Sequence, residues 1–265
     1  MLRQTVARTV SIEGTGLHRG NTVHLSIKAG EEGIIFIRNR LKIPAKPDFV
    51  VDTRLNTMLG SEGVFISTVE HLMSALYGLG ITDCEVQVDG DEMPSMDGSA
   101  LPFFNALSEA GTCTLGEIDP FIIKSLMRVG DDDTYVEITP GDFYISYSID
   151  FVEPAIGKQT YVYSGGDYEA LIAPARTFGR LSDVNAMRAM GLALGGSLEN
   201  AIVVDNDMIL NPEGLRYEDE FIRHKILDLL GDLWLLGKPV KGSIKAVKAN
   251  HRLHVELAKI IIAQI

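Results

Sequence analysis

The sequence predicts an α+β protein made of two similar two-layer units. Short segments that alternate apolar and polar residues, as strands do, occur in both halves of the chain between turn-forming residues. Each half also has a helical pattern that carries a histidine, followed by another strand and another helix. This repeated order indicates an internal duplication, and a ligand would then bind in the cleft between the two copies.

The first unit is expected to span residues 1–115. Its turn at 13–20, EGTGLHRG, contains glycines that permit backbone angles other residues resist. His18 lies in this turn, where it either is an ordinary polar turn residue or faces a ligand. The expected elements are strands at 5–12, 21–28, 33–38, 57–59 and 64–66, a helix from 67 to about 79, a strand at 81–88, a loop at 92–100 and a helix at 102–110.

The helix that starts near Ser67 carries two residues with candidate chemical roles. Glu70 follows Ser67 by three positions, which fits a capping box, so its carboxylate has a purely structural alternative. His71 lies away from the apolar stripe of this helix, on a side with small residues that allow a neighbour to approach closely.

The second unit is expected to span residues 120–265, after a short linker at 113–121. The region from about 154 to 204 is less regular than the rest. The expected elements are strands at 121–129, 134–139, 143–151 and 160–163, a helix at 167–173, a turn at 175–179, an amphipathic helix at 181–190, a helix at 216–237, a strand at 242–247, a loop at 248–251 and a final helix.

The helix at 216–237 has two distinct faces. One is a broad apolar arc, typical of a helix packed on a core. On another, His224, Asp228 and Asp232 follow at i, i+4 and i+8 and so share one side. Two carboxylates one turn apart repel each other unless a positive charge lies nearby, and a metal bound by His224 and Asp228 would supply it. The alternative is a neutralised surface on which His224 and Asp228 form an ordinary hydrogen-bonded pair.

Composition excludes several classes of protein. The 265 residues are 46% hydrophobic and 23% charged, as in globular proteins, with a formal net charge of −12. That charge argues against general nucleic-acid binding. Two cysteines, Cys84 and Cys113, are too few for a disulfide framework, and neither a signal-peptide pattern nor an apolar stretch of ~20 residues occurs. We therefore expect a cytoplasmic protein with no integral membrane segment.

The stretch at 238–259 is locally basic, with six Lys or Arg residues against one Glu. These side chains either lie on a solvated strand or form a site for an anionic ligand such as a phosphate.

Residues on the two histidine-bearing helices make metal-dependent hydrolysis a candidate function. His71, His224 and Asp228 supply two imidazoles and one carboxylate, a set that leaves the fourth position of a catalytic zinc ion to water. Such zinc lowers the pKa of its water to about 7. Glu70 points about 100° away from His71 around the helix, so it could reach that water as a general base. Ferrous iron would suit the same ligands nearly as well.

Several motifs resemble those of UDP-3-O-acyl-N-acetylglucosamine deacetylase, the zinc amidase family of lipid A biosynthesis. They are STVEHLMSAL, MDGSA, ARTFG, GGS and GLRYEDEFIRHKILDLLGDL, and the likeness runs from GLHRG near the start to NHRLH near the end. The resemblance implies two β-α-α-β sandwich domains joined head to tail, each with an insertion, and an active site at their interface. It also implies that His71, His224 and Asp228 are the zinc ligands and Glu70 the general base.

The resemblance implies roles for further residues. His251 corresponds to the histidine that assists the tetrahedral intermediate and protonates the leaving amine, and Asp232 to the carboxylate that orients it. Lys225 and Thr177 correspond to positions that stabilise the oxyanion. Because a neighbouring carboxylate raises the pKa of a histidine, Asp232 would keep His251 charged near neutral pH.

The family's reaction removes acetate from the 2-amide of UDP-3-O-(3-hydroxyacyl)-N-acetylglucosamine. The second insertion, expected within about 154–204, would line a channel for the acyl chain. Phe178 would stack on uridine, Lys248 and the basic stretch would meet the diphosphate, and His18 would contact the substrate. The candidate channel residues, each of which could equally be core, are Met187, Met190, Leu194, Leu198 and Ile202.

The loop before the last helix departs from the family pattern. Asn250 stands where glycine is usual, and His254 stands where asparagine is usual. Asn tolerates left-handed backbone angles, so the loop is expected to keep the family's backbone conformation. Sequence register assigns the acid role to His251, with His254 as the alternative.

Two other functions fit the same residues. One is a zinc amidase that acts on another N-acyl nucleotide sugar, and the other is a non-catalytic nucleotide-sugar-binding module. A binding module has no need of Glu70 or of an open metal position, which favours an enzyme. A monomer is the expected oligomeric state.

Overall fold

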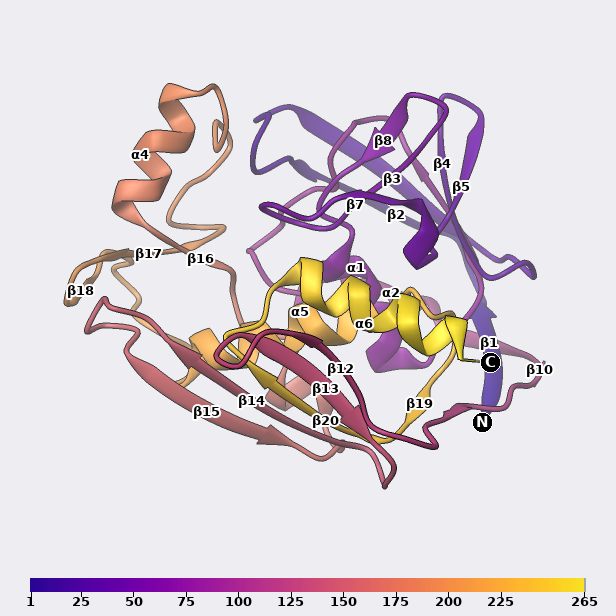
Figure 1. Ribbon diagram of the computed structural model, residues 1–265. Coiled ribbons are helices and arrows are strands. Elements are labelled where there is room, and N and C mark those ends of the chain that lie inside the picture. The colour runs from indigo at the N-terminus through magenta and orange to yellow at the C-terminus, as the bar shows by residue number, and fades with distance from the viewer. Residues whose placement is uncertain (265) are drawn as a thin grey trace.

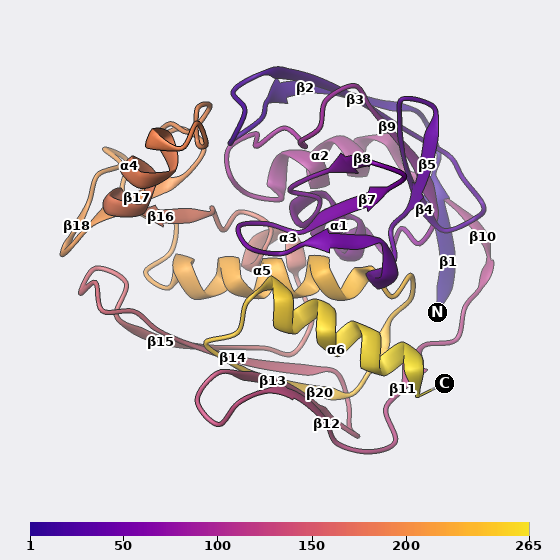
Figure 2. The same cartoon turned by 45° about the horizontal axis from the view of Figure 1, so that its top comes forward.

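The computed structural model describes residues 1–264 and has helices between two five-stranded sheets (Figure 1). Turning the molecule shows the same order of layers, from one sheet through the helices to the other sheet (Figure 2). The last residue of the second expected unit, Ile265, lies outside the described part of the chain. The α+β class predicted from the sequence is confirmed.

The first sheet has the strand order β2-β3-β9-β4-β5, and all its pairs are antiparallel except β9 with β4. Its strands alternate buried and exposed residues: Val23 and Leu25 face the helices, while His24 between them faces solvent. The bounds are β2 Val10–Thr15, β3 Thr22–Lys28, β4 Ile34–Arg38, β5 Leu41–Pro44 and β9 Cys84–Val88.

The second sheet repeats this arrangement. Its order is β12-β13-β20-β14-β15, again antiparallel except for one central pair, β20 with β14. The bounds are β12 Met127–Gly130, β13 Tyr135–Thr139, β14 Tyr144–Asp150, β15 Lys158–Tyr163 and β20 Ser243–Val247. In both sheets the central strand, β9 or β20, is the last strand of that sheet in the sequence.

Four helices fill the space between the sheets. They are α1 (Glu70–Leu79) and α2 (Leu101–Ala110) from the first unit, and α5 (Glu220–Trp234) and α6 (His251–Ala263) from the second. α1 and α5 cross at Gly231, where a Cβ would lie 2.1 Å from the carbonyl oxygen of Glu70, so only glycine allows this approach. α5 is therefore buried on its polar side as well as its apolar side, which excludes the solvated-surface alternative for His224 and Asp228.

Each unit carries a small additional sheet between its fourth strand and its first long central helix. The first insertion (residues 50–66) contains β6 Val50–Asp52, β7 Met58–Ser61 and β8 Val64–Ile66. The second insertion (residues 178–209) contains β16 Phe178–Arg180, α4 Leu181–Ala189, β17 Ile202–Asp205 and β18 Met208–Ile209, and it projects to one side (Figure 1). The shared order of sheet, insertion, helix, strand and helix supports the predicted duplication.

Several expected boundaries are wrong. The strand expected at 5–12 is two strands, β1 (Leu2–Val6) and β2, because the chain turns at residues 7–9. Part of the expected linker is β10 (Thr112–Glu117), which pairs antiparallel with β1 and so ties the N-terminus to the junction between the units. The strand expected at 121–129 is divided into β11 (Phe121–Ile122), which pairs with β19 (Val240–Lys241), and β12.

The helices also differ in detail from the prediction. The helix expected at 181–190 is present as α4, but none of its residues is fully buried, so it does not pack as an amphipathic core helix. Two short helical segments are α3 (Tyr168–Leu171) and a 3-10 turn at Pro47–Phe49. Across residues 1–264, no helix combines the length and the apolar character that crossing a membrane would require.

Candidate active site

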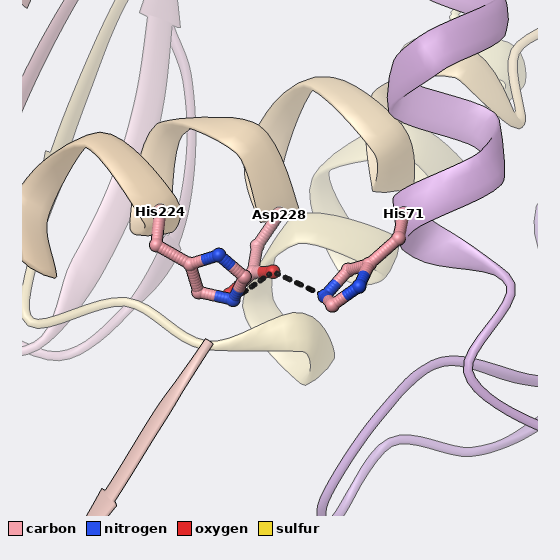
Figure 3. Close-up of side chains that lie close together, drawn as sticks. All are labelled: His71, His224 and Asp228. Carbon is pink, nitrogen blue, oxygen red and sulfur yellow. Dashed lines mark ion pairs between the residues drawn. The ribbon is translucent and has the colours of Figure 1, made fainter. Parts of the chain in front are cut away.

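The histidine-bearing helices of the two units bring three metal-ligand side chains together. His71 comes from the first turn of α1, and His224 and Asp228 come from successive turns of α5 (Figure 3). Asp228 Oδ1 lies 3.3 Å from His224 Nε2 and 4.0 Å from His71 Nε2. The two imidazole rings are perpendicular, with centroids 5.1 Å apart. One ligand atom from each residue lies within 4.8 Å of the others, so a single ion could contact all three.

The hydrogen bonds around this cluster suit a metal ion. His224 Nδ1 lies 3.0 Å from the carbonyl oxygen of Ala175, which can only accept, so Nδ1 carries the proton and Nε2 presents a lone pair to the cluster. His71 Nδ1 is buried and has no hydrogen-bond partner among the described residues. Two buried imidazoles that face one carboxylate without hydrogen bonds between them match the donor set of a transition-metal site.

Electrostatics keep the three groups in the protonation states that metal ligands require. Burial, with the neighbouring His224, lowers the pKa of His71 to about 3, and burial lowers the pKa of His224 as well. Burial alone would raise the pKa of Asp228, but His224 and Lys225 hold it well below its usual range. The site thus combines two neutral imidazoles with one carboxylate anion.

Glu70 lies beside this cluster at the start of α1. Glu70 is 3% exposed, and its Oε2 accepts a hydrogen bond of 3.0 Å from the backbone N–H of Thr57. Burial raises the pKa of Glu70 to about 8. The capping-box alternative is wrong, because the helix is capped at Val69 without a side-chain bond and the Ser67 hydroxyl donates to the carbonyl of Asp91.

A second cluster surrounds Asp232, one turn beyond Asp228. His251, the first residue of α6, has Nδ1 2.8 Å from Asp232 Oδ2. Burial would lower the pKa of His251, but the charges of Asp232 and Asp228 raise it to about 9. The side chain of His251 is 11% exposed, so its Nε2 edge can meet a ligand as a charged donor.

His254 occupies the other side of the same carboxylate. Its Nδ1 also lies 2.8 Å from Asp232 Oδ2, and its Nε2 faces the hydroxyl of Tyr147 at 3.1 Å. His254 is fully buried, and burial lowers its pKa. Both ring nitrogens are thus occupied inside the protein, whereas His251 keeps one edge open. The geometry favours His251 over His254 for proton transfer to a substrate.

Lys225, Thr177 and Phe178 lie next to the metal-ligand cluster. Lys225 Nζ lies 2.7 Å from Asp228 Oδ2 and 5.6 Å from the centre of the Phe178 ring. The backbone of Thr177 is fixed on both sides, since its N–H donates to Gly98 O at 2.7 Å and its carbonyl accepts from Ile202 N at 2.8 Å. The ring of Phe178 packs edge-on against His224 with centroids 6.2 Å apart.

A cavity of about 370 Å³ opens from this region into the second insertion. Its wall is mostly apolar, and one side is closed by the glycine-rich turn of the first unit. Four of the residues expected to bind substrate line it, namely His18, Phe178, Met187 and Leu198, and so does Thr177, the residue expected to stabilise the oxyanion.

Other expected substrate contacts lie elsewhere. Ile202, the first residue of β17, is completely buried in the core, while the residues on either side of it, Ala201 and Val203, line the cavity. Assigning Ile202 to the channel was therefore wrong by one position, because neighbouring residues of an extended chain point in opposite directions. Leu194 is 58% exposed. Met190 lines a separate cavity, of about 440 Å³, between the two insertions.

The basic stretch does not form one patch around a common point. Lys248 is 44% exposed and lies 3.4 Å from Asp150, and Lys241 lies 3.7 Å from Asp142. Lys238 covers the ring of Phe121. These contacts resemble the solvated-strand alternative more than a preformed phosphate site.

Sequence reasoning missed three residues that shape the site. Thr57, in the first insertion, contacts both Glu70 and Asp232. Arg176 is 2% exposed and forms a buried ion pair of 2.9 Å with Glu220, which anchors the segment that presents Ala175 to His224. Arg176 could have been noticed because it is a charged residue within the motif ARTFG. Tyr147 lies at an inward-facing position of an alternating strand, and its sequence pattern indicates only a core residue.

The two polar clusters, one of them with the donor set of a transition-metal site, form a candidate site of a metal-dependent hydrolase. Comparison with known proteins gives the family. The sequence pattern of LpxC, described as UDP-3-O-acyl N-acetylglycosamine deacetylase, matches residues 3–263, so the chain belongs to this family.

Relatives named UDP-3-O-acyl-N-acetylglucosamine deacetylase align along almost the whole chain. The protein from Anaeromyxobacter dehalogenans is 46% identical over 269 residues, covering 98% of this chain and 87% of the relative. That from Nautilia profundicola is 45% identical over 272 residues, covering 100% and 93%. A Helicobacter pylori relative is 44% identical over 271 residues, covering 99% and 92%. The family resemblance expected from the motifs is confirmed.

Proposed function

We propose that this chain hydrolyses the N-acetyl amide of a UDP-3-O-acyl-N-acetylglucosamine and releases acetate, a step of lipid A biosynthesis. One observation carries the proposal: His71 of the first unit meets His224 and Asp228 of the second, and Glu70 precedes His71 at the point where α1 contacts α5. The names of the relatives supply the substrate class. The expected division into units at 1–115 and 120–265 belongs to the same proposal, with each unit supplying one of the two histidine-bearing helices.

His71, His224 and Asp228 would hold the metal, and their donor set favours zinc, with ferrous iron as the second choice. When bound, the metal lowers the pKa of water and polarises the amide carbonyl. The ammonium of Lys225, already at Asp228, lies where it can stabilise negative charge on the amide oxygen, together with Thr177.

Proton transfers fall to the groups beside the metal ligands. Glu70 takes a proton from the attacking water, since its buried carboxylate is held by the Thr57 contact at the start of α1, where Glu70 directly precedes the assigned ligand His71. His251 gives a proton to the departing amine through Nε2, while Asp232 holds Nδ1 and keeps the ring charged. Base and acid therefore come from different units.

The cavity in the second insertion suits the acyl chain of the substrate. Its apolar walls include Met187 and Leu198, and Phe178, which also lines it, packs against the metal-ligand candidate His224. Uridine stacking on Phe178 and a contact of the diphosphate with Lys248 complete the proposal. Of these, the acyl site has the stronger structural support, because Lys248 already pairs with Asp150.

The decisive test is mass spectrometry of the UDP-sugar after incubation with the wild-type protein and with Glu70→Ala. We expect loss of one acetyl group, with release of acetate, only with the wild type. Elemental analysis should find one metal per chain in both proteins. Bound metal without acetate release would favour an amidase for another N-acyl sugar, and neither would favour a binding module. Cell fractionation and light scattering test the expected cytoplasmic location and monomeric state.

A further inference from the structure

The carboxylate of Asp232 receives three hydrogen bonds from three different segments. Oδ2 accepts from His251 and His254, both at 2.8 Å, and Oδ1 accepts from the hydroxyl of Thr57 at 2.5 Å. Asp232 and Thr57 are both completely buried. The Thr57 contact is the one that crosses from the first unit to the second.

Thr57 also contacts the neighbouring proton-transfer group. Its backbone N–H donates to Glu70 Oε2 at 3.0 Å, and its carbonyl accepts from Val69 N at 3.2 Å. A single residue of the first insertion therefore touches the carboxylate assigned as base and the carboxylate that orients the assigned acid.

We propose that Thr57 is a positioning residue that fixes Glu70 and Asp232 relative to each other, and through Asp232 fixes the ring of His251. This inference rests on the function proposed above. It adds to that function a role for the first insertion, which contains none of the groups assigned to metal binding or proton transfer.

The physical reason lies in the torsion of the aspartate side chain. Rotation about the bond that carries a carboxylate has broad minima, so the partners of its two oxygens determine its orientation. Two imidazoles on Oδ2 leave Oδ1 in need of a donor, because a buried acceptor without a partner destabilises the folded state. The Thr57 hydroxyl supplies that donor. Without it, Oδ1 and Oδ2 can exchange partners, and the His251 ring loses its fixed direction.

A purely structural role for Thr57 makes a different prediction. A hydrogen bond that only joins the insertion to α5 would contribute to stability and leave turnover unchanged. Thr82 provides the matched comparison, since it is a buried threonine of the same unit whose hydroxyl donates to Asp83 Oδ2 at 2.6 Å, and it has no assigned part in the reaction.

The test compares Thr57→Val, Thr57→Ser and Thr82→Val by kcat, KM, metal content and thermal unfolding. Valine keeps the shape and the backbone contact to Glu70 but removes the hydroxyl. We expect Thr57→Val to lower kcat by roughly 10- to 100-fold, since a small misplacement of a reacting group costs up to ~10²-fold. KM and metal content should stay close to wild type. Thr57→Ser should recover most of the loss, and Thr82→Val should lower the unfolding temperature without lowering kcat.

A double-mutant cycle with Asp232→Asn shows whether Thr57 acts through Asp232. Residues that act through one group are not additive, so Thr57→Val should cost little further kcat once Asp232 has been replaced. A wild-type kcat in Thr57→Val, a loss of bound metal in that variant, or a full multiplicative loss in the double variant would each overturn the inference. A wild-type enzyme that releases no acetate would instead overturn the proposed function, and the inference with it.

Discussion

The two insertions take the same place in the order of elements but contribute differently to the site. The first insertion turns inward and places Thr57, which is 0% exposed, between Glu70 and Asp232. The second insertion surrounds an apolar cavity, and its helix α4 has no fully buried residue. Both lie outside the five-stranded sheets and the four central helices, although Leu59 and Ile66 of the first and Ile202 and Val204 of the second pack into the hydrophobic core. In the proposed function, the first would supply a fixed polar partner to the groups that transfer protons, and the second would supply space for the acyl chain.

The largest effect should follow from removing His251, the proposed acid, whose ring is held by Asp232 and, through Asp232, by Thr57 of the first insertion. His251→Ala should lower kcat by about 10²–10⁴, equally for short and long acyl chains, because proton transfer does not depend on the chain. Steady-state kinetics with both substrates measures this. His254→Ala is the control, and it should cost stability more than kcat because His254 is buried between Asp232 and Tyr147. A folded His254→Ala protein with as large a loss of kcat would reverse the assignment.

Asp232→Asn should shift the pH dependence of kcat and leave the apolar cavity of the second insertion unchanged. In the proposed function the charged form of His251 is the acid, so activity should be lost as pH rises through the pKa of His251, which Asp232 helps to raise to about 9. Neutral asparagine removes that charge, so the alkaline limb should move to lower pH by about 1–3 units. A pH profile of kcat tests this, and an unchanged limb would mean that His251 is not the titrating acid.

Leu198→Trp should affect fit rather than chemistry. The added ring fills part of the cavity of about 370 Å³, so KM for a long-acyl substrate should rise by roughly tenfold or more. KM for a short-acyl analogue and kcat at saturation should change little. Equal effects on both substrates would mean that this cavity does not bind the acyl chain. The proposed difference in role between the two insertions would then be wrong.

The smallest effect is expected where the second insertion meets the first unit. Gly195 N donates to Leu17 O at 3.0 Å, and a Cβ on Gly195 would lie 2.2 Å from Gly16 O. Gly195→Ala should therefore push the two loops apart and cost about 1–3 kcal/mol of unfolding free energy. Urea denaturation measures it. Gly196→Ala is the control, because its added Cβ would lie 3.2 Å or more from any neighbour.

Local patterns were enough to predict which residues the structure brings together at the candidate site. Helical spacing placed His224, Asp228 and Asp232 on one face of α5, and the structure shows that face buried against the first unit. The same reasoning identified His71, and the two helices meet as expected. Helical periodicity is a property of a few neighbouring residues, which is why it could be recognised without the fold.

Local patterns could not find residues whose partners are distant in the chain. Thr57 bonds to Asp232 across 175 positions, and no periodicity records such a pair. Strand alternation likewise predicts that neighbours face opposite ways but not which way is inward. The sequence analysis therefore placed Ile202 in the channel, whereas its neighbours Ala201 and Val203 line the cavity in the structure.

The sequence by itself determined the α+β class, the helix faces that carry histidine and carboxylate, and the family, because these depend on residue identity and short-range spacing. Only the tertiary structure decided that Gly231 lets α1 and α5 touch, that His251 keeps one edge exposed while His254 is enclosed, and that Thr57 reaches Asp232. These features depend on which surfaces of separate elements come into contact. Such contacts are set by the packing of the whole core rather than by any one segment.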